Sequence, residues 1–120
     1  MISYHLSGQM NNLTPKRGDI LKLNYSPQAG REQKGWRPAV VISPYEYNIV
    51  SNTALLCPIT SNIQPWAWKI IIPEGEIISG AVLVDQCANR DYRARGAELC
   101  GSLSEIVMDK VIALLSTLTS

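Results

Sequence analysis

The chain has little of what metal-dependent or histidine-dependent enzymes need. Its 120 residues contain one histidine, His5, which lies in a polar N-terminal segment. Zinc sites and acid–base chemistry based on histidine are therefore not expected. The three cysteines, Cys57, Cys87 and Cys100, are odd in number, widely spaced and without a CxxC pair. This pattern is typical of free thiols in a reducing cytosol.

The chain also lacks an excess of charge of either sign and any long apolar run. Eleven lysines and arginines balance ten acidic residues, which gives a formal net charge of +1. This charge excludes a broadly basic, non-specific nucleic-acid binder, so any contact with an anionic partner must come from a local cluster of cations. The apolar runs are far shorter than a membrane helix, and no signal peptide is recognisable at the N-terminus. We expect a cytoplasmic protein that needs no membrane and no cofactor.

The length and the hydrophobic fraction of 46% predict a single folded domain. Residues 1–15 are polar and without periodicity, so we interpret them as a flexible leader before a domain at 16–120. Alternating or continuous apolar patterns predict strands at 19–25, 39–42, 54–59, 66–72, 81–84 and 97–100. Pro58 indicates an edge or a bulge near the end of its strand. Segment 45–52 is predicted to be an irregular turn or a single helical turn, and 90–95 a charged connection.

The C-terminal segment changes to helical periodicity. Ser102 and Glu105 have the spacing of a capping box, with Ser102 as the N-cap. Beyond them apolar residues recur at helical spacing, at Val107, Val111, Leu114, Leu115 and Leu118. Several short strands and one closing helix predict a mostly β fold, either a strongly bent antiparallel sheet or a small SH3-like barrel.

The most informative segment is the loop at 30–38, which leads directly into a β-branched strand. Loops on a rigid strand commonly carry binding and catalysis. Glu32 offers a base for a 2′-hydroxyl proton, and Arg37 a fixed positive charge for the transition state of phosphodiester cleavage. The alternative is a surface ion pair that contributes at most about 1 kcal/mol to stability. The two residues alone do not decide between these interpretations.

Other residues offer contacts to RNA, each with a structural alternative. Thr60 ends a strand and can donate its hydroxyl to a phosphate, or bond its own backbone in a turn. Trp36 lies within the charged loop and is a candidate for a base contact. Trp66 and Trp68 are two apart, so they either stack on bases or fill the core. Arg90, Arg93 and Arg95 form either a phosphate groove or a solvated connection.

Five short motifs occur in the order that they have in the MazF/PemK (Kid) family of toxin endoribonucleases, which this chain resembles over roughly 100 residues from Lys16 onward. The motifs are Arg17-Gly18-Asp19-Ile20, the Gly-x-Glu-Gln-x-Gly-x-Arg-Pro pattern at 30–38, Pro58-Ile59-Thr60, Asp85-Gln86 and Ala94-Arg95-Gly96. The resemblance implies an SH3-like barrel homodimer that cleaves single-stranded RNA without metal and leaves 2′,3′-cyclic phosphate and 5′-hydroxyl ends. It also implies a cognate antitoxin whose disordered acidic tail blocks the RNA cleft.

The same resemblance assigns roles to individual residues. The implied catalytic residues are Glu32, Arg37 and Thr60. The implied RNA-binding residues are Arg31, Gln33, Trp36, Ser61, Asp85, Gln86 and Arg95. The Kid subgroup uses an arginine two residues before the aspartate and a histidine before Glu-Gln, where this chain has Leu83 and Arg31. The chain therefore resembles the MazF branch, and the Kid scheme of acid–base residues does not carry over.

Two rival interpretations remain open. A topoisomerase-inhibiting toxin of the CcdB kind shares this fold, but it acts through a tryptophan near the end of the C-terminal helix. The present helix ends without one, in Leu-Ser-Thr-Leu-Thr-Ser at 115–120. The second rival is an RNA- or peptide-binding barrel that has lost catalysis, against which the complete set of Glu32, Arg37 and Thr60 argues. Fold alone does not separate these functions.

Overall fold

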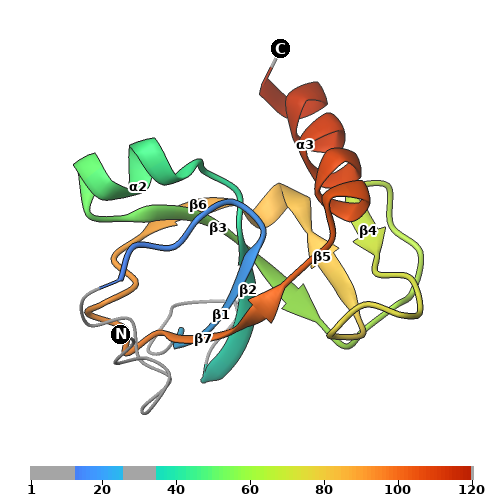
Figure 1. The fold of residues 1–120 in the computed structure, drawn as a ribbon. Helices are drawn as coiled ribbons and strands as arrows, with labels where there is room; N and C mark the ends of the chain where they lie inside the picture. Colours follow the sequence, from blue (N-terminus) through green and yellow to red (C-terminus); the bar gives the residue numbers. More distant parts are fainter. Residues whose placement is uncertain (1–12, 26–34, 120) are drawn as a thin grey trace.

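The computed structural model describes residues 13–25 and 35–119, which form one antiparallel sheet with a helix at its C-terminus (Figure 1). The strands follow the order β4-β5-β3-β2-β1-β7, and β6 pairs separately with β3. Because β4 and β7 end this path without pairing to each other, the described sheet remains open. The predicted mostly β fold with a C-terminal helix is confirmed. The strands are β1 (Asp19–Asn24), β2 (Trp36–Val41), β3 (Ala54–Thr60), β4 (Lys69–Ile71), β5 (Ala81–Leu83), β6 (Ala88–Arg90) and β7 (Glu98–Ser102).

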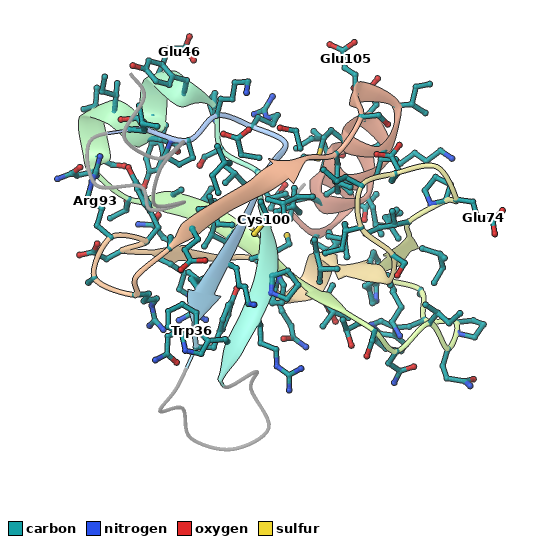
Figure 2. All side chains as sticks on the ribbon, turned by 60° about the horizontal axis from the view of Figure 1, so that its bottom comes forward. Trp36, Glu46, Glu74, Arg93, Cys100 and Glu105 are labelled. Atoms are coloured by element: carbon teal, nitrogen blue, oxygen red, sulfur yellow. The ribbon has the colours of Figure 1, made fainter. Side chains whose placement is uncertain are left out.

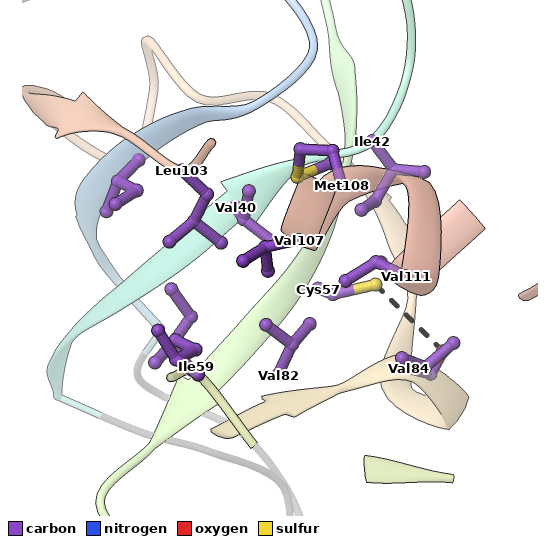
Figure 3. Close-up of a cluster of buried hydrophobic side chains, with 12 residues drawn as sticks. Val40, Ile42, Cys57, Ile59, Val82, Val84, Leu103, Val107, Met108 and Val111 are labelled. Atoms are coloured by element: carbon purple, nitrogen blue, oxygen red, sulfur yellow. Dashed lines mark hydrogen bonds between the residues drawn. The ribbon is translucent and has the colours of Figure 1, made fainter. Parts of the chain in front are cut away.

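The two faces of the central strands each carry a separate hydrophobic cluster. Side chains alternate between faces along a strand, so Val40 enters one cluster and its neighbours Ala39 and Val41 enter the other. The first cluster is covered by helix α3 (Glu105–Thr119), which contributes Val107 and Val111 among its buried residues (Figure 3). Burial on both faces makes β1, β2 and β3 the rigid centre of the molecule.

Strand β3 lies in the middle of the sheet, although Pro58 predicts an edge or a bulge. Its first edge pairs with β2, with Ala39 opposite Pro58. Its second edge is divided between β6, which pairs with residues 54–56, and β5, which pairs with residues 59 and 60. Pro58 falls in the gap between these two partners, where no ladder bond requires its missing N–H group. The proline therefore marks a break in one edge rather than an edge strand.

The N-cap of α3 is Ser104, so the prediction of Ser102 is wrong. The hydroxyl of Ser104 accepts a hydrogen bond from the Val107 N–H at 3.4 Å. Ser104 also donates from its backbone and its hydroxyl to the carboxylate of Glu76, and these bonds lower the pKa of Glu76. Ser102 lies in β7, and its hydroxyl donates to Asp19 instead.

Segment 45–52 contains a regular helix of seven residues, α2 (Tyr45–Ser51), where the sequence predicts an irregular turn or a single helical turn. The helix is anchored by Asn48, whose side chain is fully buried. The amide of Asn48 donates to the carbonyl oxygens of Pro15 at 2.8 Å and of Ser43 at 3.2 Å. Its oxygen accepts from the Ser43 hydroxyl, which in turn accepts from the Leu55 N–H. One side chain thus joins α2, β3 and the N-terminal segment.

Replacing Asn48 with alanine should lower the free energy of unfolding by about 1–3 kcal/mol, because it leaves buried partners unpaired. Urea unfolding followed by circular dichroism measures this loss. Val50→Ala is the matched control, since Val50 belongs to the same helix and is 85% exposed. Its effect should stay within about 0.5 kcal/mol. Equal midpoints for the two variants would contradict the anchoring role of Asn48.

The remaining differences concern segment boundaries. The strand predicted at 66–72 begins only at Lys69, and β6 occupies the start of the predicted connection 90–95. Within the predicted leader, Pro15 is buried and Leu13 packs against the second cluster, so these residues belong to the packed domain. The leader before Leu13 lies outside the described residues and stays a prediction. In the described ranges no helix is long and apolar enough to cross a membrane.

Candidate functional site

Arg37 and Thr60 lie near the ends of two neighbouring strands. Strands β2 and β3 pair with Ala39 opposite Pro58 and Val40 opposite Cys57. This ladder ends at the pair of Ala39 and Pro58, and Arg37 and Thr60 each lie two residues beyond it. From there β2 continues along β1, and β3 continues along β5. The sheet therefore places two of the three predicted catalytic residues at one end of the same strand pair, and Glu32 lies outside the described residues.

The position of Arg37 leaves its side chain accessible at the boundary of the core. Arg37 is exposed, although its strand neighbour on the same face, Ala39, is fully buried. On β1 its partner is Leu23, which is also fully buried. Arg37 thus lies at the exposed end of a packed strand pair. A guanidinium carried there offers its planar set of donors to an anionic ligand.

The Thr60 hydroxyl accepts one hydrogen bond within the protein and still carries a hydrogen that it can donate. Its hydroxyl oxygen accepts a hydrogen bond from the Asn62 N–H at 3.1 Å, the turn contact that the structural alternative predicts. A hydroxyl that accepts in this way can still donate its own hydrogen. Thr60 is half-buried and pairs with Ala81 of β5 on its other side. Both interpretations of Thr60 are therefore compatible with the same geometry.

Gly80 allows the chain to pass closely by Thr60. Its φ of +126° lies in a region that residues with a side chain rarely adopt. A Cβ atom at this position would stand 2.4 Å from the carbonyl oxygen of Thr60. This approach fixes the position of Thr60, and it is specific to glycine.

The loop at 61–68, which follows Thr60, is held by hydrogen bonds from side chains. The Lys69 ammonium donates to the carbonyl oxygens of Asn62 at 2.9 Å and of Gln64 at 2.8 Å. The indole N–H of Trp66 donates to the Asp85 carboxylate at 3.3 Å. Ser61 is exposed at the start of this loop. Asp85 thus supports an aromatic ring, a contact that the sequence does not reveal.

Asp85 and Gln86 belong to the short 3-10 helix η1 (Val84–Gln86), and both are exposed. Trp66 is 54% exposed, whereas Trp68 is half-buried. Of the two tryptophans, Trp66 is therefore the one that is placed to meet a ligand. The sequence predicts Trp66 and Trp68 only as alternative candidates for base stacking, because their spacing of two residues does not show which of them is exposed. The bond to Asp85, a residue distant in the sequence, is not visible in that pattern.

The predicted residue Trp36 lies on the other face of β2. Trp36 packs its ring over Gly96, where a Cβ would stand 3.2 Å from the indole. With Lys22 and Glu98 it lines a shallow hollow of about 300 Å³. Alternation along β2 points Trp36 to the face opposite Arg37. Figure 2 shows Trp36 at the ends of β1 and β2, apart from Arg93.

Arg90, Arg93 and Arg95 all contact other parts of the protein. Arg95 is half-buried and donates to the carbonyl oxygen of Asn24 at 3.0 Å. Arg93 donates to the Leu13 carbonyl at 3.1 Å and to the Asn52 side chain, and its guanidinium lies 4.8 Å from the centre of the Tyr92 ring. Arg90 lies 5.5 Å from the centre of the Tyr25 ring. These contacts favour a structural role for Arg90 and Arg93, while Arg95 stays a predicted RNA contact.

Several predicted residues fall outside the geometry given above. Arg31, Glu32 and Gln33 lie outside the described residues, so their roles stay predictions. Among the residues that the structure does describe, no three acidic, histidine or cysteine side chains are grouped to hold a metal ion. The described site thus combines a cation and a hydroxyl, at the ends of two neighbouring strands, with a loop that presents an aromatic ring. Such a set suits an anionic polymer with planar bases.

Comparisons with known proteins agree with this geometry. Residues 16–119 match the family model described as the PemK-like, MazF-like toxin of type II toxin-antitoxin system. The endoribonuclease toxin MazF of Escherichia coli (strain K12) is 30% identical over 109 residues, which cover 91% of this chain and 97% of that protein. The endoribonuclease PemK of Escherichia coli is 33% identical over 107 residues, covering 86% and 80%.

Solved structures give the same result. The crystal structure of MazF (Form-I) from Deinococcus radiodurans superposes with a TM-score of 0.83 at 37% identity, covering 90% of this chain and 98% of that one. The MazE-MazF structure (Form-II) from the same organism gives a TM-score of 0.80 at 37% identity, covering 90% and 97%. Fold, sequence and the residues at the strand ends thus lead to one family.

Proposed function

Because this chain belongs to the PemK-like and MazF-like toxins of type II toxin–antitoxin systems, we propose that it is an endoribonuclease that cleaves single-stranded messenger RNA and stops growth. The observation that supports this most directly is that Arg37 and Thr60 each lie two residues beyond the last pair of β2 and β3, Ala39 with Pro58. Related proteins named endoribonucleases cover most of the chain. Messenger RNA is a cytoplasmic substrate, so we place the activity in the cytoplasm.

The proposed reaction is a transesterification within the RNA. The carboxylate of Glu32 takes the proton of the 2′-hydroxyl, and the 2′-oxygen attacks the adjacent phosphorus. The bond from phosphorus to the 5′-oxygen breaks, and this oxygen takes up a proton. The products are a 2′,3′-cyclic phosphate and a 5′-hydroxyl. No metal ion is needed in this scheme, because protein side chains supply both the base and the positive charge.

Arg37 and Thr60 act on the phosphate in this scheme. Negative charge grows on the equatorial phosphate oxygens in the transition state, and a guanidinium fixed at a strand end is oriented before the reaction. The Thr60 hydroxyl donates to one of the same oxygens while its own oxygen stays bonded to Asn62. Asp85 orients Trp66 through the indole N–H, and the ring then offers a surface for a base.

The test of the function is incubation of the purified protein with a long single-stranded RNA in EDTA, followed by mapping of the product ends. Discrete fragments with 5′-hydroxyl ends support the proposal and give the cut site. Without cleavage by folded wild-type protein, the endoribonuclease proposal fails. A DNA supercoiling assay then tests the topoisomerase-inhibiting alternative, and an RNA-binding assay tests the inactive barrel.

Glu32→Gln should lower the cleavage rate and flatten its pH dependence on the acid side. A carboxylate must be ionised to accept the 2′-hydroxyl proton, so activity that depends on it falls as acid protonates it. Glutamine does not titrate and removes this acid limb. The measurement is kcat/KM across the acid range, with thermal unfolding as a check of the fold. An unchanged acid limb in the variant would exclude Glu32 as the base.

Trp66→Ala should raise KM more than it lowers kcat, by about 5- to 150-fold, because one stacked base is worth about 1–3 kcal/mol. Trp66→Phe keeps a ring but loses the bond to Asp85, so we expect an intermediate effect. Ile63→Ala is the matched control from the same loop, as Ile63 is 58% exposed. If Trp66→Ala and Ile63→Ala behave alike with a short single-stranded substrate, Trp66 makes no base contact.

The proposed partners are an antitoxin and a second copy of this chain. The structure of MazF from Deinococcus radiodurans with MazE is 37% identical in sequence to this chain. We infer that a cognate antitoxin binds here as well, and that its disordered acidic tail crosses the end of the sheet near Arg37. We also infer a homodimer, as the family resemblance implies. Light scattering of the chain alone tests the homodimer, and co-expression with the antitoxin followed by light scattering tests the complex.

A further inference from the structure

Two of the three cysteines come together in the first hydrophobic cluster, beneath the C-terminal helix. Cys57 lies in β3 and is fully buried within the first cluster. Cys87 follows η1, is half-buried and packs against the same cluster. The carbonyl oxygen of Val84 is reached by both residues, at 3.9 Å from the Cys57 sulfur and 3.3 Å from the Cys87 backbone nitrogen. Figure 3 shows Cys57 pointing from β3 toward Val84.

The register of the sheet explains this meeting. Strands β3 and β5 pair with Ile59 opposite Val82. Continuing this pairing by two residues places Val84 opposite Cys57, and η1 then brings Cys87 back over the same point. Cys87 packs against the cluster that contains Cys57, and each thiol shifts the pKa of the other. Since η1 and β3 are separate elements, the contact is a product of folding and not of sequence proximity.

The two thiols differ in a way that suits them to different steps. The interaction with the Cys57 thiol lowers the pKa of Cys87. The same interaction and burial raise the pKa of Cys57, and the negative charge of Asp85 adds to this effect. Cys87 therefore loses its proton first, and it is also the thiol that solvent can reach. The thiolate is the nucleophile in thiol chemistry, so Cys87 reacts before Cys57.

We propose that Cys57 and Cys87 are an oxidation site, at which hydrogen peroxide converts the two thiols into an intramolecular disulfide. In the first step the Cys87 thiolate attacks one peroxide oxygen, the O–O bond breaks, and hydroxide leaves a sulfenic acid on Cys87. In the second step the Cys57 sulfur attacks the Cys87 sulfur. Its proton and the sulfenic hydroxyl leave together as water. Overall, two thiols and one peroxide give one disulfide and two waters.

The disulfide would join two segments of the candidate site. Thr60 lies three residues after Cys57 on β3, and Asp85 lies two residues before Cys87. The site differs from Cys100, which is exposed on β7 and does not belong to the first cluster. Cys100 therefore serves as an internal comparison. The thiol chemistry does not require RNA cleavage and is tested apart from it.

The test uses the reduced full-length chain, treated with hydrogen peroxide at neutral pH, blocked with a maleimide in denaturant and digested with trypsin without reduction. Cleavage after Lys34, Lys69, Arg90 and Lys110 separates the three cysteines into three different peptides. We expect a linked pair of the peptides that carry Cys57 and Cys87, lighter than their sum by two hydrogen atoms. Dithiothreitol should restore both peptides, and dilution of the protein should not reduce the yield.

Three variants establish the roles within the pair. In Cys57→Val, which keeps an apolar side chain of similar volume, the sulfenic acid on Cys87 should persist and be trapped by dimedone. In Cys87→Val, Cys57 should stay reduced. Cys100→Ser should give the linked pair in full yield. The proposal is overturned if peroxide leaves Cys57 free in the wild type, or if Cys87 links only to Cys100 or to a second chain.

Discussion

Arg37→Ala is expected to abolish RNA cleavage, a loss of at least about two to three orders of magnitude in kcat. The guanidinium supplies the fixed positive charge in the proposed reaction. The fold should persist, because the side chain is exposed at the end of β2. Growth arrest on expression should disappear with the same substitution.

Two further variants make this result specific. Arg37→Lys keeps the charge but loses the planar pair of donors, so we expect only partial recovery of the rate. Lys22→Ala removes an exposed cation from the adjacent strand on the opposite face and should leave cleavage unchanged. Single-turnover cleavage and circular dichroism measure these effects. Full activity of a folded Arg37→Ala protein would refute the mechanism, and persistent growth arrest would favour topoisomerase inhibition.

Gly80→Ala should produce the second large effect, on stability and cleavage together. The new Cβ would stand 2.4 Å from the Thr60 carbonyl oxygen, so β3 or β5 must move. Overpacking of this kind costs about 1–3 kcal/mol, in addition to about 1–3 kcal/mol for a side chain at positive φ. Because Thr60 moves away from Arg37, the cleavage rate should fall by more than the folded fraction does.

Gly75→Ala separates the two contributions. Gly75 has a φ of +97°, but its Cβ would meet nothing within 4 Å. It therefore carries the conformational cost without the collision, and its cleavage rate should equal that of the wild type once folding is taken into account. Urea unfolding and initial rates are compared for both variants. If the two glycines respond equally in both measurements, the contact with Thr60 has no influence on the site.

The strands were accessible from the sequence in part, but their pairing was not. The alternating and apolar patterns predict β1, β3 and the part of β2 from Ala39 onward. Trp36 and Arg37, which were predicted in the loop at 30–38, lie in β2. The register that brings Arg37 and Thr60 to the same end of a strand pair is set by the whole sheet. Trp66 was predicted only as one of two candidates for base stacking, because its bond to Asp85 spans two segments.

Polar residues led to wrong predictions at helix α2 and at the start of helix α3. Segment 45–52 contains polar residues that indicate a turn, yet Asn48 is a buried anchor and its partners come from other segments. Ser102 has the spacing of an N-cap, but Asp19 binds its hydroxyl, and Ser104 caps the helix with support from Glu76. In both cases a polar side chain bonds to a residue that is distant in the sequence. A local sequence pattern cannot predict such a partner.

The pairing of β1 with β7 determines when, during its synthesis, this protein can fold. Asp19 pairs with Ser102, so one edge of β1 stays uncovered until more than four fifths of the chain has been made. Such long-range pairing is slow, and a nascent chain that lacks β7 also lacks α3, which covers the first cluster. One edge of β1 and the face of the sheet that α3 covers therefore stay exposed until β7 and α3 have been synthesised.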